Sequence, residues 1–145
     1  MTISRPKRLL TSNFARIRAL ADHGHSRALI PIVRHLPSWL PGEIAERNQP
    51  RLAPPTGLLA AAKQGRISWQ QYELRFDEAV LGGLDQDRVY DALVQGAGGQ
   101  LPVLLCYCKG KDGHCHRHLV ARWLDGAGYQ CSEWSPPSLQ MTLFG

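Results

Sequence analysis

The sequence lacks the long apolar stretches that membrane-spanning and secreted proteins carry. No run approaches the ~20 consecutive apolar residues that a transmembrane helix needs. The N-terminal segment, residues 1–8, does not lead into the apolar region and small-residue cleavage site of a signal peptide. From these two absences we predict a cytoplasmic protein with no membrane partner.

Cysteine is also scarce, and the four cysteines are crowded rather than spread along the chain. Cys106, Cys108 and Cys115 lie close together, and Cys131 follows them. A small secreted domain held by disulfides distributes its cysteines more widely, whereas a cluster in a reducing compartment more often binds metal or reacts. Cys106 and Cys131 also have a purely structural interpretation, as small core residues on strands.

Acidic residues are outnumbered, with 12 Asp and Glu against 17 Lys and Arg, which gives a formal net charge of +5. The excess is strongest near the N-terminus, between Arg5 and Arg18. A basic surface suits an anionic partner, nucleic acid included. Because the sequence shows no helix-turn-helix, zinc-finger or other reader pattern, a nucleic-acid-binding accessory protein is one alternative among several.

The length of 145 residues predicts one domain that covers residues 1–145. Short apolar runs that alternate with helical patterns predict a single layered α/β domain, with a mostly parallel sheet of about four strands flanked by helices. The strand candidates are residues 8–13, 28–33, 103–108 and 129–134. Pro31 lacks a ladder donor, so the second strand is expected either to lie at a sheet edge or to start late.

Residues 41–55 are rich in proline and charge and are interpreted as a long loop, and residues 135–145 as a peripheral tail. Helix starts are easier to recognise. Thr56 is a candidate N-cap, Ser68 begins a capping box, and Asp85 or Asp87 can cap a third helix.

The third strand candidate, residues 103–108, leads into a polar loop and then into a helical pattern. Cys115, His116 and Arg117 fall where that helix begins. In an open α/β sheet, ligands bind at the carboxyl ends of the strands, and free backbone N–H groups at a helix start favour anions. The sequence therefore predicts a functional site at this edge of the sheet.

Polar residues also follow the first two strands. If those strands flank the third, Ser12, Asn13, Arg34 and His35 line the same edge as Cys115 and become substrate-binding candidates. Lys109, from the loop, raises the local positive potential and joins the same set.

The segment Val103–Cys106 followed by Cys115-His116-Arg117 resembles the family named domain of unknown function 488. Further segments that match are residues 11–13, 52–54, 65–72 and 133–134. The resemblance covers roughly residues 9–134 and implies a compact cytosolic α/β domain whose site includes Cys106, Cys115, His116 and Arg117. It implies no particular reaction. Relatives often carry an acidic residue where this chain has Cys108.

The leading hypothesis from the residues is an anion-binding pocket that contains a thiol. Cys115 is the candidate reactive thiol, His116 a proton carrier or orienter, and Arg117 an anion clamp. Such a site suits an enzyme acting on a small phosphorylated or nucleotide-like substrate. The spacing differs from phosphatase and sulfurtransferase loops, in which the arginine follows the cysteine by several residues.

Two other interpretations remain open. Cys106 and Cys108 share a face if both lie on the strand, and they would supply zinc ligands together with Cys115 and one histidine, His114, His116 or His118. The set in this alternative, a zinc-binding structural module, is Cys106, Cys108, Cys115 and His116. In the simpler alternative, His116 or Arg117 only ties the loop to the sheet by hydrogen bonds.

Overall fold

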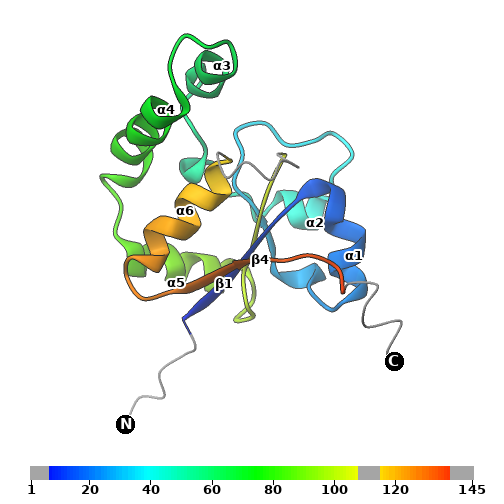
Figure 1. Cartoon of the computed structure of the whole chain (residues 1–145). Helices are drawn as coiled ribbons and strands as arrows, with labels where there is room; N and C mark the ends of the chain where they lie inside the picture. The colour runs from blue at the N-terminus through cyan, green and yellow to red at the C-terminus, as the bar shows by residue number, and fades with distance from the viewer. Residues whose placement is uncertain (1–6, 108–114, 138–145) are drawn as a thin grey trace.

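The computed structural model describes residues 7–107 and 115–137 of the chain. The described residues form a four-stranded parallel sheet with the strand order β2-β3-β1-β4 (Figure 1). The strands are β1 (Arg8–Asn13), β2 (Leu29–Pro31), β3 (Val103–Cys106) and β4 (Gln130–Glu133). The predicted α/β fold is confirmed.

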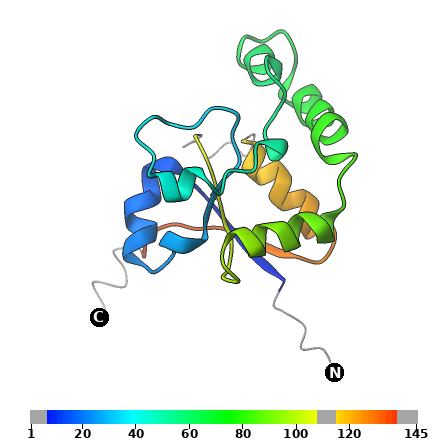
Figure 2. The same cartoon turned by 180° about the vertical axis from the view of Figure 1, so that it is seen from behind.

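Helices cover both faces of the sheet (Figures 1 and 2). One face carries α1 (Ile17–Asp22) and α2 (Gly42–Ala45), and the other carries α5 (Gln86–Gly96) and α6 (His116–Asp125). Two further helices, α3 (Leu58–Lys63) and α4 (Trp69–Phe76), extend beyond α6 on the side away from the sheet. No helix among the described residues is long and apolar enough to cross a membrane.

The two central strands are buried because helices cover the sheet on both sides. Every residue of β3 is buried, and only Arg8 of β1 is exposed. A parallel strand with helices on both faces needs apolar side chains in both directions, which gives a continuous apolar run rather than an alternating pattern. The edge strand β4 is mostly exposed, so Cys131 is half-buried there rather than a core residue.

The strand β2 lies at one edge of the sheet, as Pro31 predicted. It is shorter than the predicted strand at residues 28–33, because the preceding residues, Ser26–Ala28, form a 3-10 turn. Past the strand, the backbone N–H and C=O of Val33 bond to the Asn48 side chain instead of a neighbouring strand.

Two of the predicted helix starts are confirmed and one is wrong. Ser68 forms both bonds of the capping box with Gln71, and the Asp85 carboxylate accepts from Arg88 N at 2.9 Å. Thr56 caps nothing, because α3 starts after Gly57 and has no side-chain cap. Gly57 has a φ of 87°, a left-handed conformation that glycine adopts without the steric cost of a Cβ.

The prediction of a long loop over residues 41–55 is wrong. This segment contains α2 and a 3-10 turn at Pro50–Leu52, and both pack into the core through the buried side chains of Ile44 and Leu52. Elements of four and three residues are too short to show a helical period in the sequence. The proline and charged residues of this segment therefore resemble a loop.

Candidate functional site

The site is built around two buried thiols that come from different elements. Cys106 is the last residue of β3 and is fully buried, and Cys115 occupies the N-cap position of α6 with 3% of its surface exposed. His116 is the first residue of α6. The potential ligand atoms of Cys106, Cys115 and His116 all lie within 4.8 Å of one another.

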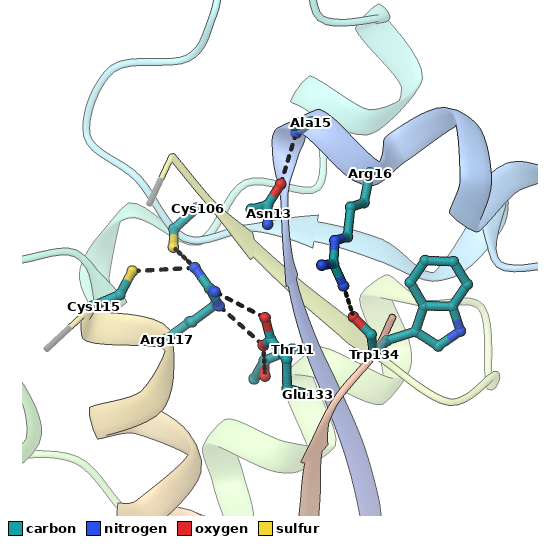
Figure 3. A network of polar contacts seen from close by, with 9 residues as sticks. All are labelled: Thr11, Asn13, Ala15, Arg16, Cys106, Cys115, Arg117, Glu133 and Trp134. Carbon is teal, nitrogen blue, oxygen red and sulfur yellow. Dashed lines mark hydrogen bonds and ion pairs between the residues drawn. The ribbon is translucent and has the colours of Figure 1, made fainter. Parts of the chain in front are cut away.

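The guanidinium of Arg117 joins the two thiols. Its Nη1 lies 3.0 Å from the Sγ of Cys106 and 3.5 Å from the Sγ of Cys115 (Figure 3). Arg117 is only 1% exposed although it carries a charge. A buried cation needs a nearby anion, because the interior solvates it poorly.

Glu133 on β4 supplies that anion. Its carboxylate accepts from Arg117 Nε at 3.1 Å and from Nη2 at 2.8 Å, so the ion pair is bidentate. Bidentate pairing fixes the plane of the guanidinium as well as its position. With Nε and Nη2 directed at the carboxylate, the remaining nitrogen, Nη1, faces the two thiols.

The strand register explains why Glu133 is available there. Thr11 of β1 pairs with Glu133 of β4, and side chains of paired residues project from the same face of a sheet. The Thr11 Oγ1 hydroxyl donates to Glu133 Oε1 at 2.6 Å. The buried Thr11 side chain thus orients the Glu133 carboxylate, although the Glu133 side chain is 34% exposed.

The electrostatics keep Arg117 charged. Burial by itself lowers the pKa of the guanidinium, but the hydrogen bond to Glu133 and the negative charge that Cys106 and Cys115 can carry outweigh it and raise the pKa above its ordinary value. A permanently charged guanidinium therefore lies beside two thiols, and a positive charge beside a thiol favours its thiolate form.

His116 is held in one orientation by the backbone. Its Nε2 lies 2.6 Å from the carbonyl oxygen of Ile32, just past β2. A carbonyl only accepts, so in this bond Nε2 carries the proton and donates it. In the neutral ring this tautomer places the lone pair on Nδ1, where it can accept a proton or bind a metal.

A pocket of about 260 Å³ opens on one side of His116. It is lined by Val33, Arg34, His35, Ala53, Pro54, Pro55, Thr56, Gly57, Leu59, Tyr107 and His116. Arg34 Nε donates to the carbonyl of Pro54 at 2.7 Å, and the Tyr107 hydroxyl donates to the carbonyl of His35 at 2.6 Å. His116 therefore lies between this pocket and the two thiols.

The sheet order brings most of the sequence-predicted residues to one edge. Because β3 lies between β1 and β2, the residues that follow these strands meet there. Arg34 and His35 line the pocket next to His116. Asn13 is paired with Cys106 and caps the following 3-10 turn, its Oδ1 accepting from Ala15 N at 3.0 Å.

Ser12 is not brought to the thiols. It follows Thr11 and precedes Asn13, so its side chain projects from the opposite face of the sheet. The hydroxyl is fully buried and has no hydrogen-bond partner among the described residues. Lys109 and Cys108, the other predicted ligand and metal candidates, lie outside the described residues.

Sequence reasoning assigned no role to Glu133, Thr11 or Tyr107. Glu133 falls in a segment that the family resemblance covered, yet the resemblance named no function for it. Arg117 could have indicated that an acidic residue belongs to the site, since an arginine on the buried side of a helix requires an acidic partner. Which acid serves depends on strand pairing, which the sequence alone does not display.

Cys106, Cys115 and His116 could hold a metal ion. Two thiol sulfurs and one imidazole nitrogen within 4.8 Å of one another are donors that zinc prefers, and three protein ligands with an open fourth position are typical of catalytic zinc. The fourth ligand predicted from the sequence, Cys108, is not among the described residues. The described donors therefore fit zinc in type and proximity.

Comparison with known proteins returned one family. A family model described as "Active DUF488-N3 subclade" matches residues 13–128 of the chain. No curated protein and no solved structure matches the chain. The matched region starts at the end of β1 and includes Cys106, Cys115, His116 and Arg117, but it ends before Glu133.

Proposed function

This chain belongs to the domain of unknown function 488 family, and from the geometry of its site we propose that it is a cytoplasmic thiol enzyme acting on a small anionic, phosphorylated ligand. The observation that carries the proposal is the position of Arg117 Nη1 between the sulfurs of Cys106 and Cys115. A buried cation in that place favours one negative charge on the thiol pair.

Cys115 is the nucleophile in this proposal. It occupies the N-cap position of a ten-residue helix, where the helix dipole adds to the charge of Arg117, and it is slightly more exposed than Cys106. The thiolate sulfur bonds to an electrophilic atom of the ligand, and the electron pair of the broken bond leaves with the departing group. His116 borders both the pocket and the thiols, so its Nδ1 takes the proton that the Cys115 thiol gives up and then passes that proton to the departing group.

The role of Arg117 changes from the sequence hypothesis. Its Nε and Nη2 bond to Glu133 and its Nη1 contacts the thiols, so it acts on sulfur rather than on the ligand. Arg34 and His35, which line the pocket and are exposed, are the proposed anion contacts. A reducing cytoplasm fits this arrangement, because the mechanism requires both thiols to stay reduced.

Selective alkylation shows whether thiol ionisation or solvent exposure determines which cysteine reacts first. Cys131 is half-buried, so it is more accessible than Cys115, but burial and the nearby Asp125 raise its pKa to about 11. In brief pulses of iodoacetamide at neutral pH, mapped by peptide mass spectrometry, we expect Cys115 to be labelled before Cys131. Faster labelling of Cys131 would mean that exposure governs reactivity and would contradict the proposal.

The zinc-binding module is the second candidate, and the clustering of donors from Cys106, Cys115 and His116 favours it. The two candidates differ in how they respond to a chelator. A bound metal protects its cysteine ligands from alkylation, so Cys115 would be labelled only after chelation. In the thiol enzyme, labelling of Cys115 is equally fast with and without a chelator. One experiment, run in both conditions, therefore distinguishes the two.

A further inference from the structure

An exposed tyrosine lines the pocket, and it shares a packing partner with an exposed tryptophan outside the lining. Tyr107 lines the pocket and is 52% exposed, and Trp39 is 61% exposed. Both rings pack edge-on against Phe14, with centroid separations of 5.0 Å for Tyr107 and 6.3 Å for Trp39. The buried ring of Phe14 thus supports two exposed rings on the site's edge of the sheet. An exposed aromatic ring in the lining of a cavity is typical of a binding surface.

The ionisable side chains other than tyrosine that line the pocket are all basic. Arg34 and His35 are exposed side chains on its wall, and none of the described residues that line it is acidic. The bond from Arg34 Nε to the carbonyl of Pro54 holds the guanidinium at the rim, and its two Nη groups have no partner among the described residues. Those groups suit a phosphate, which guanidinium binds in a bidentate manner.

The size and walls of the pocket indicate what else the ligand contains. A volume of about 260 Å³ lies below the ~300–1,000 Å³ typical of pockets that enclose a whole drug-sized ligand. It accommodates one ring system, while the rest of the ligand lies on the rim. The walls are mostly apolar, including Pro54, Pro55 and Leu59, and the half-exposed Tyr107 ring is part of the lining.

We propose that the ligand of this site is a nucleotide, with its base against Tyr107 and the apolar wall and its phosphate on Arg34 and His35. This assignment rests on the proposed function, whose substrate class it names. A sugar phosphate matches the basic side chains of the pocket but leaves the Tyr107 ring unused, and an uncharged aromatic compound leaves Arg34 unused. A free nucleotide and the 5′-phosphorylated end of a nucleic-acid strand share this chemistry.

The test is calorimetric titration of the full chain carrying Cys115→Ser, which blocks covalent chemistry, with AMP, adenosine and ribose 5-phosphate. We expect AMP to bind about tenfold or more tightly than either fragment, since base stacking and the phosphate contact both contribute. A 5′-phosphorylated trinucleotide that binds more tightly than AMP identifies the strand end as the source of the ligand; weaker binding identifies the free nucleotide. Equal affinity for AMP and ribose 5-phosphate, or no AMP binding, would overturn the proposal.

Variants assign the contacts. Tyr107→Ala is expected to weaken AMP about tenfold and leave ribose 5-phosphate unchanged, while Tyr107→Phe, which keeps the ring, restores AMP binding. Arg34→Gln is expected to weaken AMP and leave adenosine unchanged. Leu74→Ala is the matched control, because Leu74 is 58% exposed on α4 and does not line the pocket. An equal loss for Leu74→Ala and Tyr107→Ala would also overturn the proposal.

Nucleotide binding in the pocket and nucleophilic chemistry at Cys115 are tested by different measurements. If AMP does not bind but Cys115 is still alkylated before Cys131, the thiol chemistry stands and the nucleotide assignment falls. If AMP binds with the expected dependence on Tyr107 and Arg34 but Cys131 is labelled first, the pocket assignment stands and the role of Cys115 as nucleophile falls.

Discussion

Replacing Arg117 with methionine is expected to lower the free energy of unfolding by about 3 kcal/mol, because removing one partner of a buried ion pair leaves the other uncompensated. Methionine retains an unbranched apolar side chain, so most of the loss comes from the charge and its hydrogen bonds. Arg117 is 1% exposed, bonds to Glu133 at 2.8 and 3.1 Å, and contacts both thiols. Urea unfolding followed by circular dichroism measures the change.

The chain offers a matched control for this substitution on the same helix. Arg122 forms an ion pair with Glu73 at 3.9 Å, but its side chain is 62% exposed. Pairs in this setting contribute little because water screens them. Arg122→Met is therefore expected to change stability by less than about 0.5 kcal/mol. Similar losses of stability for the two variants would show that the ion pair of Arg117 contributes no more to the fold than an exposed ion pair.

Replacing Glu133 with glutamine is expected to cost about 2 kcal/mol, within the usual range for hydrogen bonds to charged groups. Glutamine keeps the length of the side chain, but its amide N–H₂ faces a guanidinium that also only donates. The Thr11 hydroxyl, 2.6 Å from Oε1, keeps an acceptor only if the amide oxygen takes that position. The loss is smaller than for Arg117 because the Glu133 side chain is 34% exposed and water compensates part of it.

The same variant separates the structural role of Glu133 from its effect on the site. If Glu133 fixes the guanidinium plane, Glu133→Gln also slows alkylation of Cys115, whereas Glu73→Gln changes neither stability nor alkylation. A variant that loses stability but alkylates Cys115 at the unchanged rate would indicate that the ion pair only ties α6 to β4.

Local signals predicted the local parts of this structure. The strand β1 has its predicted bounds, two leucines followed by small polar residues, and the capping box at Ser68 needs only residues within one helical turn. The proximity of Cys106, Cys115, His116 and Arg117 was predictable because these residues flank a strand-to-helix junction. These features depend on neighbours in the chain, which the sequence displays directly.

The polar network depends on distant pairing and was not predictable in this way. Thr11 and Glu133 are 122 positions apart, and they meet only because β4 pairs with β1 in one register. The faces on which the Ser12 and Asn13 side chains lie also depend on strand register. Side chains alternate between the faces of a strand, so the pairing of Asn13 with Cys106 decides which of these two neighbours faces the site.

Ionisation of Tyr107 and Tyr129 does not obscure a spectroscopic test of the thiols. Burial raises the pKa of Tyr107, and burial together with the hydrogen bond to Asp87 raises that of Tyr129. Both phenols therefore ionise only above the ordinary tyrosine value of about 10. Thiolate absorbance in the ultraviolet can be followed at lower pH without a contribution from these two groups.

The central claim is that Arg117 holds one thiolate on the pair formed by Cys106 and Cys115. Its most direct test is a pH titration of thiolate absorbance in chelator-treated protein, taken as the difference between the wild type and the Cys106→Ser/Cys115→Ser double variant. We predict one thiolate equivalent with a midpoint clearly below the ordinary cysteine value of about 8.5, and a higher midpoint after Arg117→Met. A difference signal that stays flat until pH reaches about 8.5 or more would contradict the claim.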